Sequence, residues 1–131
     1  MGLSPRSYAY GANDPSWRVS RDGKGVERSV RLDVSTFTPA THYPEGYLPS
    51  GIPLARVTTT GAYGLYDGDA TDGRGTLAGF LAETVHDVRP DDEDRLVPLM
   101  WRGVIRPGLL PFAVDPAGLA DVAAHVLIEK G

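Results

Sequence analysis

Apolar and polar residues alternate with a period of two in one stretch, VERSVRLDV, at positions 26–34. Four of the five positions on one face are apolar, with Arg28 as the exception: Val26, Val30, Leu32 and Val34. Strict alternation of this length predicts a β-strand. An isolated strand is not stable in water, so this one must add to a sheet of its own domain or of a neighbouring protein.

Two shorter apolar segments, Ala55–Thr60 and Tyr63–Tyr66, predict a hairpin whose turn lies at Gly61. Glycine takes the positive φ that a tight turn needs. A further segment, Leu77–Val85, is apolar on both faces, which predicts a strand covered on both sides. Gly79 in its middle indicates a bulge or the close approach of another backbone.

The loop between these segments carries three aspartates, Asp67, Asp69 and Asp72, which raises the question of a calcium site. An EF-hand loop has glycine at its sixth position and a bidentate glutamate at its twelfth. Counted from Asp67, these positions hold Asp72 and Ala78. The spacing therefore favours a solvated turn held by hydrogen bonds from aspartate side chains, with no metal bound.

The last third of the chain predicts strands at Leu96–Trp101 and around Val104, preceded by a charged loop at Asp87–Arg95. Asp115 and Pro116 are typical of a helix start, and the apolar spacing that follows has the helical period. The residues Val126-Leu127-Ile128 are expected to form a last strand. The predicted fold is mainly β with one short helix, resembling a β-clip.

The composition divides the chain into an arm, a tether and a domain. Residues 1–25 show no period, which predicts an extended, mobile arm whose aromatics Tyr8, Tyr10 and Trp17 could be anchors for a partner. Residues 35–53 contain four prolines and predict an extended tether. A β-rich domain is then expected over residues 48–131, in keeping with 16 glycines and 11 prolines in 131 residues.

Charge and residue content limit the candidate chemistry. A net charge of −4 argues against nucleic acid as a partner, and no apolar stretch approaches the roughly 20 residues that cross a bilayer. The absence of cysteine excludes disulfides and thiolate metal sites. The three histidines fit no metal spacing, and no nucleophile motif is present, so the chain is not expected to be an enzyme or to hold a cofactor.

The run GAYGLYDGDATDGRGTLAGFLAE resembles a segment of the lambda-type bacteriophage head decoration proteins. In that family a strand ends in an aromatic residue plus Asp-Gly, and a Thr-Asp-Gly loop and a Gly-aliphatic-Leu-Ala strand follow. The later element order is also similar, so the resemblance covers about two-thirds of the chain, roughly Leu48–Glu129.

The resemblance implies a cement protein without catalysis or cofactor. Proteins of this family form homotrimers at the three-fold sites of an expanded capsid, and their amino-terminal arm orders on the major capsid protein. The chain would then act on the outer surface of the virion, after a stay in the host cytoplasm during assembly. It would stabilise the head against internal DNA pressure.

Two sets of contact residues are predicted for that role. The capsid-binding set is the alternating strand, expected to pair with a sheet edge of the capsid protein, together with Trp17: Val26, Glu27, Arg28, Ser29, Val30, Arg31, Leu32, Asp33 and Val34. The trimer set lies on the expected edge strands: Leu99, Trp101, Val104 and Ile105.

A binding module is the alternative function. It would take a carbohydrate on a platform of Tyr63, Tyr66 and Trp101, or calcium on the three aspartates of the loop. A hydrolase that uses the acidic residues near Asp91 is a more distant third interpretation.

Overall fold

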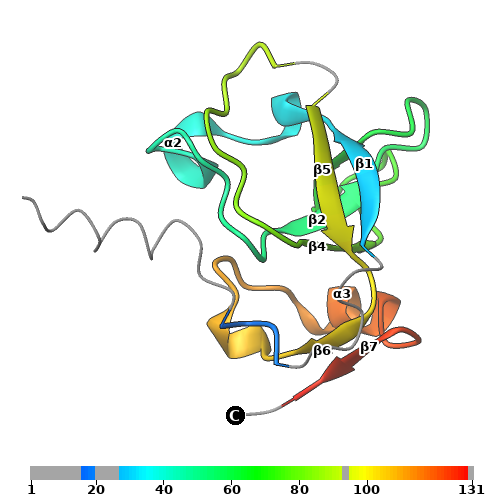
Figure 1. Cartoon of the computed structure of the whole chain (residues 1–131). Helices are drawn as coiled ribbons and strands as arrows, with labels where there is room; N and C mark the ends of the chain where they lie inside the picture. Colours follow the sequence, from blue (N-terminus) through cyan, green and yellow to red (C-terminus); the bar gives the residue numbers. More distant parts are fainter. Residues whose placement is uncertain (1–15, 20–26, 93–94, 130–131) are drawn as a thin grey trace, which may run out of the picture.

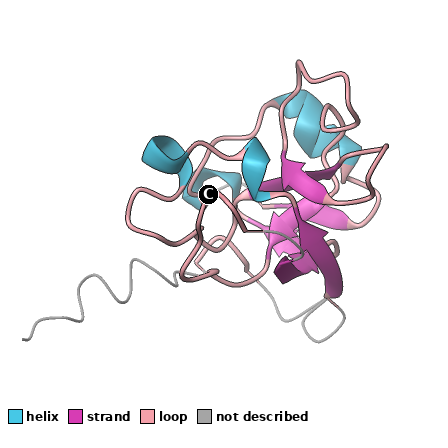
Figure 2. Ribbon diagram, turned by 90° about the horizontal axis from the view of Figure 1, so that it is seen from above, coloured by secondary structure: helices cyan, strands magenta, loops and turns pink. Residues whose placement is uncertain are grey.

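The computed structural model describes residues 16–19, 27–92 and 95–129 (Figure 1). The fold is mainly β, as predicted, and Figure 2 shows the strands lying together with the helices at the periphery. The elements in chain order are β1 (Arg28–Leu32), the 3₁₀ helix η1 (Val34–Thr36), α2 (Pro39–His42), β2 (Pro53–Arg56), β3 (Tyr63–Leu65), β4 (Gly79–Leu81), β5 (Arg95–Met100), β6 (Gly103–Ile105), the 3₁₀ helix η2 (Pro107–Leu109), α3 (Pro116–Asp121) and β7 (Val126–Ile128).

Five strands close into a barrel in the order β1-β3-β2-β4-β5. The longest pairing in the barrel is the antiparallel one between β1 and β5, which runs from Arg28 opposite Leu99 to Leu32 opposite Arg95. On its other side β1 pairs with β3 in parallel, through Leu32 opposite Tyr63. The predicted hairpin forms between β2 and β3, but its first strand ends at Arg56 and not at Thr60; Gly61 in the connection has φ +76°.

A smaller unit lies below the barrel in Figure 1 and contains β6, η2, α3 and β7. Strands β6 and β7 pair in parallel, from Gly103 opposite Val126 to Ile105 opposite Ile128. Residues 16–19 add to the other edge of β6 in the antiparallel direction, through a bridge between Arg18 and Ile105. We call this part of the molecule the lower unit.

The wall between the two parts is made by β4 and β5, whose side chains alternate between two cores. Leu81 and Leu99 point into the barrel core, whereas Phe80 and Met100 belong to the core of the lower unit. All three residues of β4 are buried, which confirms the predicted strand covered on both sides. A Cβ on Gly79 would overlap the carbonyl oxygen of Met100, so the predicted close approach of another backbone is also confirmed.

The prediction that residues 35–53 form a tether outside the domain is wrong. This segment contains η1 and α2, a helix that the sequence did not predict, and it contributes Phe37, Tyr43 and Leu48 to the barrel core. Prolines prevent regular structure along most of its length, but they do not prevent single apolar side chains from packing. The folded unit therefore begins well before residue 48.

Helix α3 begins as predicted. The Asp115 side chain accepts a hydrogen bond from the backbone N–H of Gly118, and Pro116 is the first helical residue. The helix ends at Asp121, earlier than the apolar spacing suggested. The last of the spaced residues, Val126, lies in β7 and not in the helix. The predicted last strand at residues 126–128 is confirmed.

Candidate interaction site

The predicted capsid-binding strand belongs to the chain's own barrel. Val30, Leu32 and Val34 are buried in the barrel core, one edge of β1 pairs with β5 along its whole length, and the other edge meets β3 at Leu32. A strand whose apolar face and backbone groups are already used cannot add to the sheet of another protein. The prediction of strand addition by residues 26–34 is therefore wrong for the described residues, and Val26 lies outside them.

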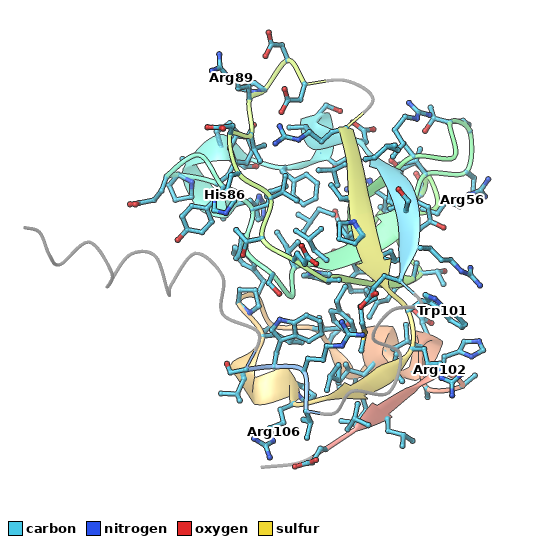
Figure 3. All side chains as sticks on the ribbon, viewed as in Figure 1. Arg56, His86, Arg89, Trp101, Arg102 and Arg106 are labelled. Atoms are coloured by element: carbon cyan, nitrogen blue, oxygen red, sulfur yellow. The ribbon has the colours of Figure 1, made fainter. Side chains whose placement is uncertain are left out.

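The polar residues of this strand also bind groups of the same chain. Asp33 caps η1 by accepting a hydrogen bond from the backbone N–H of Ser35, and Ser29 is exposed. The three remaining contacts are Glu27 Oε2 with Arg18 Nη1 at 2.8 Å, the Arg28 guanidinium carbon over the Trp101 ring at 4.4 Å, and Arg31 Nη2 with the carbonyl oxygen of Thr60 at 2.9 Å. Figure 3 shows Trp101 at the junction between the barrel and the lower unit.

Trp17 is an aromatic anchor, but the site that receives it belongs to the same chain. Its side chain is 1% exposed, its ring lies 5.7 Å from that of Phe80, and its Nε1 donates a hydrogen bond to Ser50 Oγ at 3.0 Å. The predicted contact of Trp17 with a capsid is therefore wrong. Residues 16–19 are an ordered part of the lower unit, whereas residues 1–15 and 20–25 of the predicted arm lie outside the described residues.

The four predicted trimer residues divide into two pairs. Leu99 and Ile105 are at most 2% exposed and fill the two cores of their own chain, so they are not available to a second copy. Trp101 and Val104 are half-buried and reach the surface. Alternation along a strand predicts which residues share a face, but it does not say which face the chain itself covers.

The lower unit has an exposed apolar surface that was not predicted from the sequence. Leu127 is 65% exposed and Ile128 is 37% exposed, although both lie in a strand. Val104 of β6 lies directly opposite Leu127 in the register and so on the same face of the small sheet. We call Val104 and Leu127 the β7 surface; Ile128, the next residue of the strand, lies in register with the buried Ile105 and so on the other face of the sheet. The sequence held a signal for this surface, because Val126-Leu127-Ile128 is apolar at every position and a strand exposes alternate residues unless both of its faces are covered.

The outer edge of β7 is also open. Among the described residues β7 has one strand partner, β6, so its other edge presents backbone groups without a ladder. Open edges next to exposed apolar side chains pair readily with other chains. The barrel, by contrast, has no open edge, since its five strands close on themselves.

The loop at residues 67–76 has the hydrogen bonds that the sequence predicted. Asp67 Oδ1 accepts from the N–H of Asp69 at 3.0 Å, and Asp72 Oδ1 accepts from the N–H of Arg74 at 3.2 Å. The Arg74 side chain also binds Asp72 Oδ2 at 3.0 Å, and these contacts with Arg74 lower the pKa of Asp72 below its usual range. No cluster of three metal-ligating side chains occurs within residues 16–19, 27–92 and 95–129.

The three aromatic residues of the alternative binding platform lie in different surroundings. Tyr63 packs on the barrel core, Tyr66 packs on the core of the lower unit, and Trp101 contacts Arg28 and His125. The Tyr66 hydroxyl donates a hydrogen bond to Asp115 Oδ1 at 2.8 Å. Burial, followed by this contact with Asp115, raises the pKa of Tyr66 to about 12.

The charged loop before β5 is at the end of the barrel away from the lower unit, where Figure 3 shows Arg89. Asp92 forms an ion pair with Arg95 at 2.8 Å and accepts a hydrogen bond from the backbone N–H of Arg89 at 3.0 Å. These contacts give Asp92 a structural role in closing the loop. Glu93 and Asp94 lie outside the described residues.

Comparison with known proteins finds no match to a protein-family model, to a curated protein or to a solved structure. In the part of the chain that the structure describes, no helix has the length and apolar character needed to cross a membrane. The function is therefore inferred from the chain's own residues and their geometry.

Proposed function

We propose that this protein is a head decoration protein, which binds as a homotrimer at the three-fold sites of an expanded phage capsid and stabilises the head. The observation that carries the proposal is the β7 surface, an exposed apolar patch beside a strand edge that has no strand partner among the described residues. Such a patch indicates a contact with protein, because leaving it in water has a free-energy cost that association removes. The resemblance of residues 61–83 to the decoration proteins selects a capsid among the possible assemblies.

The β7 surface also replaces part of the predicted trimer contact. Leu99 and Ile105 are buried in their own chain, but Val104 lies next to Leu127 on the exposed face of the small sheet. We propose that Val104 and Leu127 make the contact between subunits. Closed rotational symmetry suits a surface of this size, because each subunit then covers its neighbour's patch and no edge is left open.

Weak contacts are sufficient for a protein that binds an assembled shell. Three subunits joined in a trimer place the second and third capsid contacts at high effective concentration once the first has formed. A protein that binds the assembled head and not its separated subunits stabilises the head by mass action. Neither step needs a catalytic group or a bound ion.

The geometry gives less support to the alternative calcium or carbohydrate module. The Asp72 carboxylate is already bound by Arg74, and Asp67 is used within the loop. The Tyr66 hydroxyl is bound to Asp115, which also holds the first turn of α3. A ligand at these groups would have to displace contacts that hold the domain together.

Electron microscopy tests the proposal, with purified protein mixed with expanded phage heads that lack their decoration protein. We expect density at the three-fold sites and a rise in the temperature at which the heads break. Leu127→Asp should abolish both effects, because a carboxylate in the subunit contact would be desolvated without a partner. Leu96→Asp is the matched control, since Leu96 is 69% exposed on the barrel wall and should tolerate the change.

Two results would contradict the proposal. Heads that stay undecorated at protein concentrations well above those of their own decoration protein would remove the capsid as partner. Decoration that survives Leu127→Asp but is lost with Leu96→Asp would place the contact on the barrel and not on the β7 surface.

A further inference from the structure

A groove of about 270 Å³ lies between the stretch from residue 41 to residue 49 and the two residues at 111–112. The first stretch begins in α2, at the upper left of Figure 1, whereas β7 lies at the lower right. The volume is below the roughly 300–1,000 Å³ typical of small-molecule sites, so the side chains of a peptide suit the groove better than a cofactor does. Most of the lining residues carry rings: His42, Pro44, Tyr47, Pro49, Pro111 and Phe112.

The ring of His42 is held in place by contacts within the domain. It lies 5.8 Å from the Phe37 ring, edge-on, and 5.2 Å from the Phe112 ring. Its Nδ1 accepts a hydrogen bond from the backbone N–H of Thr38 at 2.8 Å, and Phe112 packs on the barrel core. Rings that are already fixed lose little side-chain entropy when a ligand binds, so this wall of the groove is preorganised.

The uncharged polar groups of the lining are hydrogen-bond donors. Burial lowers the pKa of His42, so the ring is neutral at neutral pH, and its hydrogen is on Nε2 because Nδ1 is an acceptor. The hydroxyl groups of Thr41 and Tyr47 can also donate, and none of these three groups has a hydrogen-bond partner among the described residues. Proline-rich chains match such a set, because proline has no N–H and the polyproline II conformation leaves every carbonyl oxygen free to accept.

Glu45 gives the groove a negative charge. It is exposed, it is the one acidic residue of the lining, and the lining contains no lysine or arginine. Glu45 forms no ion pair with any residue in the part of the chain that the structure describes, so its carboxylate is available to a partner. An arginine side chain would bind this carboxylate through two parallel N–H groups and stack its plane on a neighbouring ring.

We propose that this groove binds a proline-rich segment of another protein, with proline rings of the segment against Tyr47, Pro49 and Phe112 and an arginine at Glu45. Grooves lined by aromatic rings recognise such segments because the polyproline II helix is already extended and loses little entropy on binding. It has three residues per turn, so prolines three positions apart lie on one face. The lining shares no residue with the β7 surface, and the proposal therefore stands independently of decoration.

Fluorescence anisotropy with the full-length protein tests the proposal, using a short labelled peptide of prolines that ends in arginine. We expect saturable binding of this peptide. A peptide of glycine and serine that ends in the same arginine should bind about tenfold more weakly, because it is not preformed as a polyproline II helix. A proline peptide that ends in glutamate should bind several-fold more weakly, since its charge repels Glu45.

Two pairs of variants place the peptide in the groove. Tyr47→Ala should weaken binding by about tenfold, because an aromatic anchor carries much of the affinity of a contact. Tyr63→Ala is its matched control, since Tyr63 is a half-buried tyrosine of β3 that does not line the groove. Glu45→Gln should weaken binding several-fold, whereas Asp69→Asn changes the net charge equally and should have no effect. Melting temperatures check that each variant is folded.

Four results would overturn the proposal. No saturation at peptide concentrations up to about 1 mM would mean that the groove does not bind such a segment. Equal affinities for the proline peptide and the glycine-serine peptide would mean that the rings do not select proline. Equal losses in Tyr47→Ala and Tyr63→Ala would place the peptide elsewhere on the domain. An affinity that rises as the protein is diluted would assign the groove to a second copy of the chain.

Discussion

The barrel and the lower unit differ in how completely they cover their own strands. In the barrel every strand has two partners, and the core is formed by aliphatic residues with a few aromatic ones. In the lower unit a three-residue strand forms an open edge, and Leu109, Leu127 and Ile128 stay exposed. Of the four exposed large apolar side chains among the described residues, one lies on the barrel, Leu96, and the other three lie in the lower unit, which therefore has more apolar surface available for a partner. The difference locates the candidate contact more clearly than any single motif does.

The two parts are nevertheless not independent, because β4 and β5 supply side chains to both cores. The lower unit is also too small to be stable on its own, since a short two-stranded sheet and a helix of six residues bury little apolar surface. We therefore expect the whole domain to unfold in one transition.

The largest expected effect comes from Trp17→Ala. Removing a fully buried tryptophan costs about 3–5 kcal/mol of unfolding free energy, and the change also leaves Ser50 Oγ without its donor. Leu54→Ala in the barrel core should cost about 2–5 kcal/mol. Both variants should unfold in a single urea transition monitored by circular dichroism and by tryptophan fluorescence, which in Trp17→Ala comes from Trp101 alone. Two separate transitions in Trp17→Ala would show that the barrel and the lower unit are uncoupled.

A smaller effect is expected from Gly79→Ala, which acts on the shared wall. The added Cβ would overlap the carbonyl oxygen of Met100 and force β4 away from β5, which costs about 1–3 kcal/mol. Gly108→Ala is the matched control, since its Cβ would meet open space and its backbone has negative φ. Equal denaturation midpoints for the two variants would contradict the close packing of the wall.

The contact between the loop and α3 should appear in the pH dependence of stability. The pKa of Tyr66 is raised to about 12 by burial and by Asp115, above its ordinary value of about 10. The folded protein therefore holds this proton more tightly than the unfolded chain does. The stabilisation is complete below pH 10 and is lost as the pH rises from 10 to 12. Tyr66→Phe should remove this alkaline loss from a series of melting temperatures, whereas Tyr63→Phe should retain it.

Asp115 gives the opposite dependence at acidic pH. Its pKa is lowered by the hydrogen bond from the Gly118 N–H and then by that from Tyr66. The folded protein therefore binds this proton less tightly than the unfolded chain, and the stabilisation is present above about pH 4 and is lost as the pH falls further. Asp115→Asn should reduce the fall in melting temperature between about pH 4 and lower pH. An unchanged fall would mean that other carboxylates dominate it.

The smallest effect is expected in the loop at residues 67–76. Asp69→Asn/Asp72→Asn should lower the melting temperature slightly, because Arg74 loses its ion pair with Asp72. The loss should be equal in calcium and in EDTA, measured by differential scanning fluorimetry. A rise of many degrees with calcium in the parent and not in the variant would favour the calcium-binding module.

The sequence predicted features whose cause is local. The alternation of Val30, Leu32 and Val34 follows from one buried face, and the start of α3 follows from the capping geometry of Asp115. Gly79 indicated a close backbone contact, because a Cβ at this position would overlap the carbonyl oxygen of Met100. Each of these features can be recognised from a few neighbouring residues, since the physical requirement lies within one element.

Features that depend on a distant partner were predicted wrongly or missed. The alternating strand was assigned to another protein, because periodicity identifies the buried face of a strand but not the strands beside it. The segment at 35–53 contributes Phe37, Tyr43, Leu48 and Ile52 to the core at irregular spacing, so no period reveals them. The exposed Leu127 was missed because its environment depends on how little of the chain covers β7.

The pairing of β1 with β5, and of residues 16–19 with β6, has a consequence for synthesis. Each of these amino-terminal segments is synthesised well before the strand with which it pairs, so the domain cannot close until β5 and β6 have been made. During that interval Trp17 and the apolar face of β1 are exposed to other nascent chains, and such faces aggregate readily. We therefore expect the yield of protein to depend on the chaperones that hold the amino-terminal third until β5 and β6 have been made.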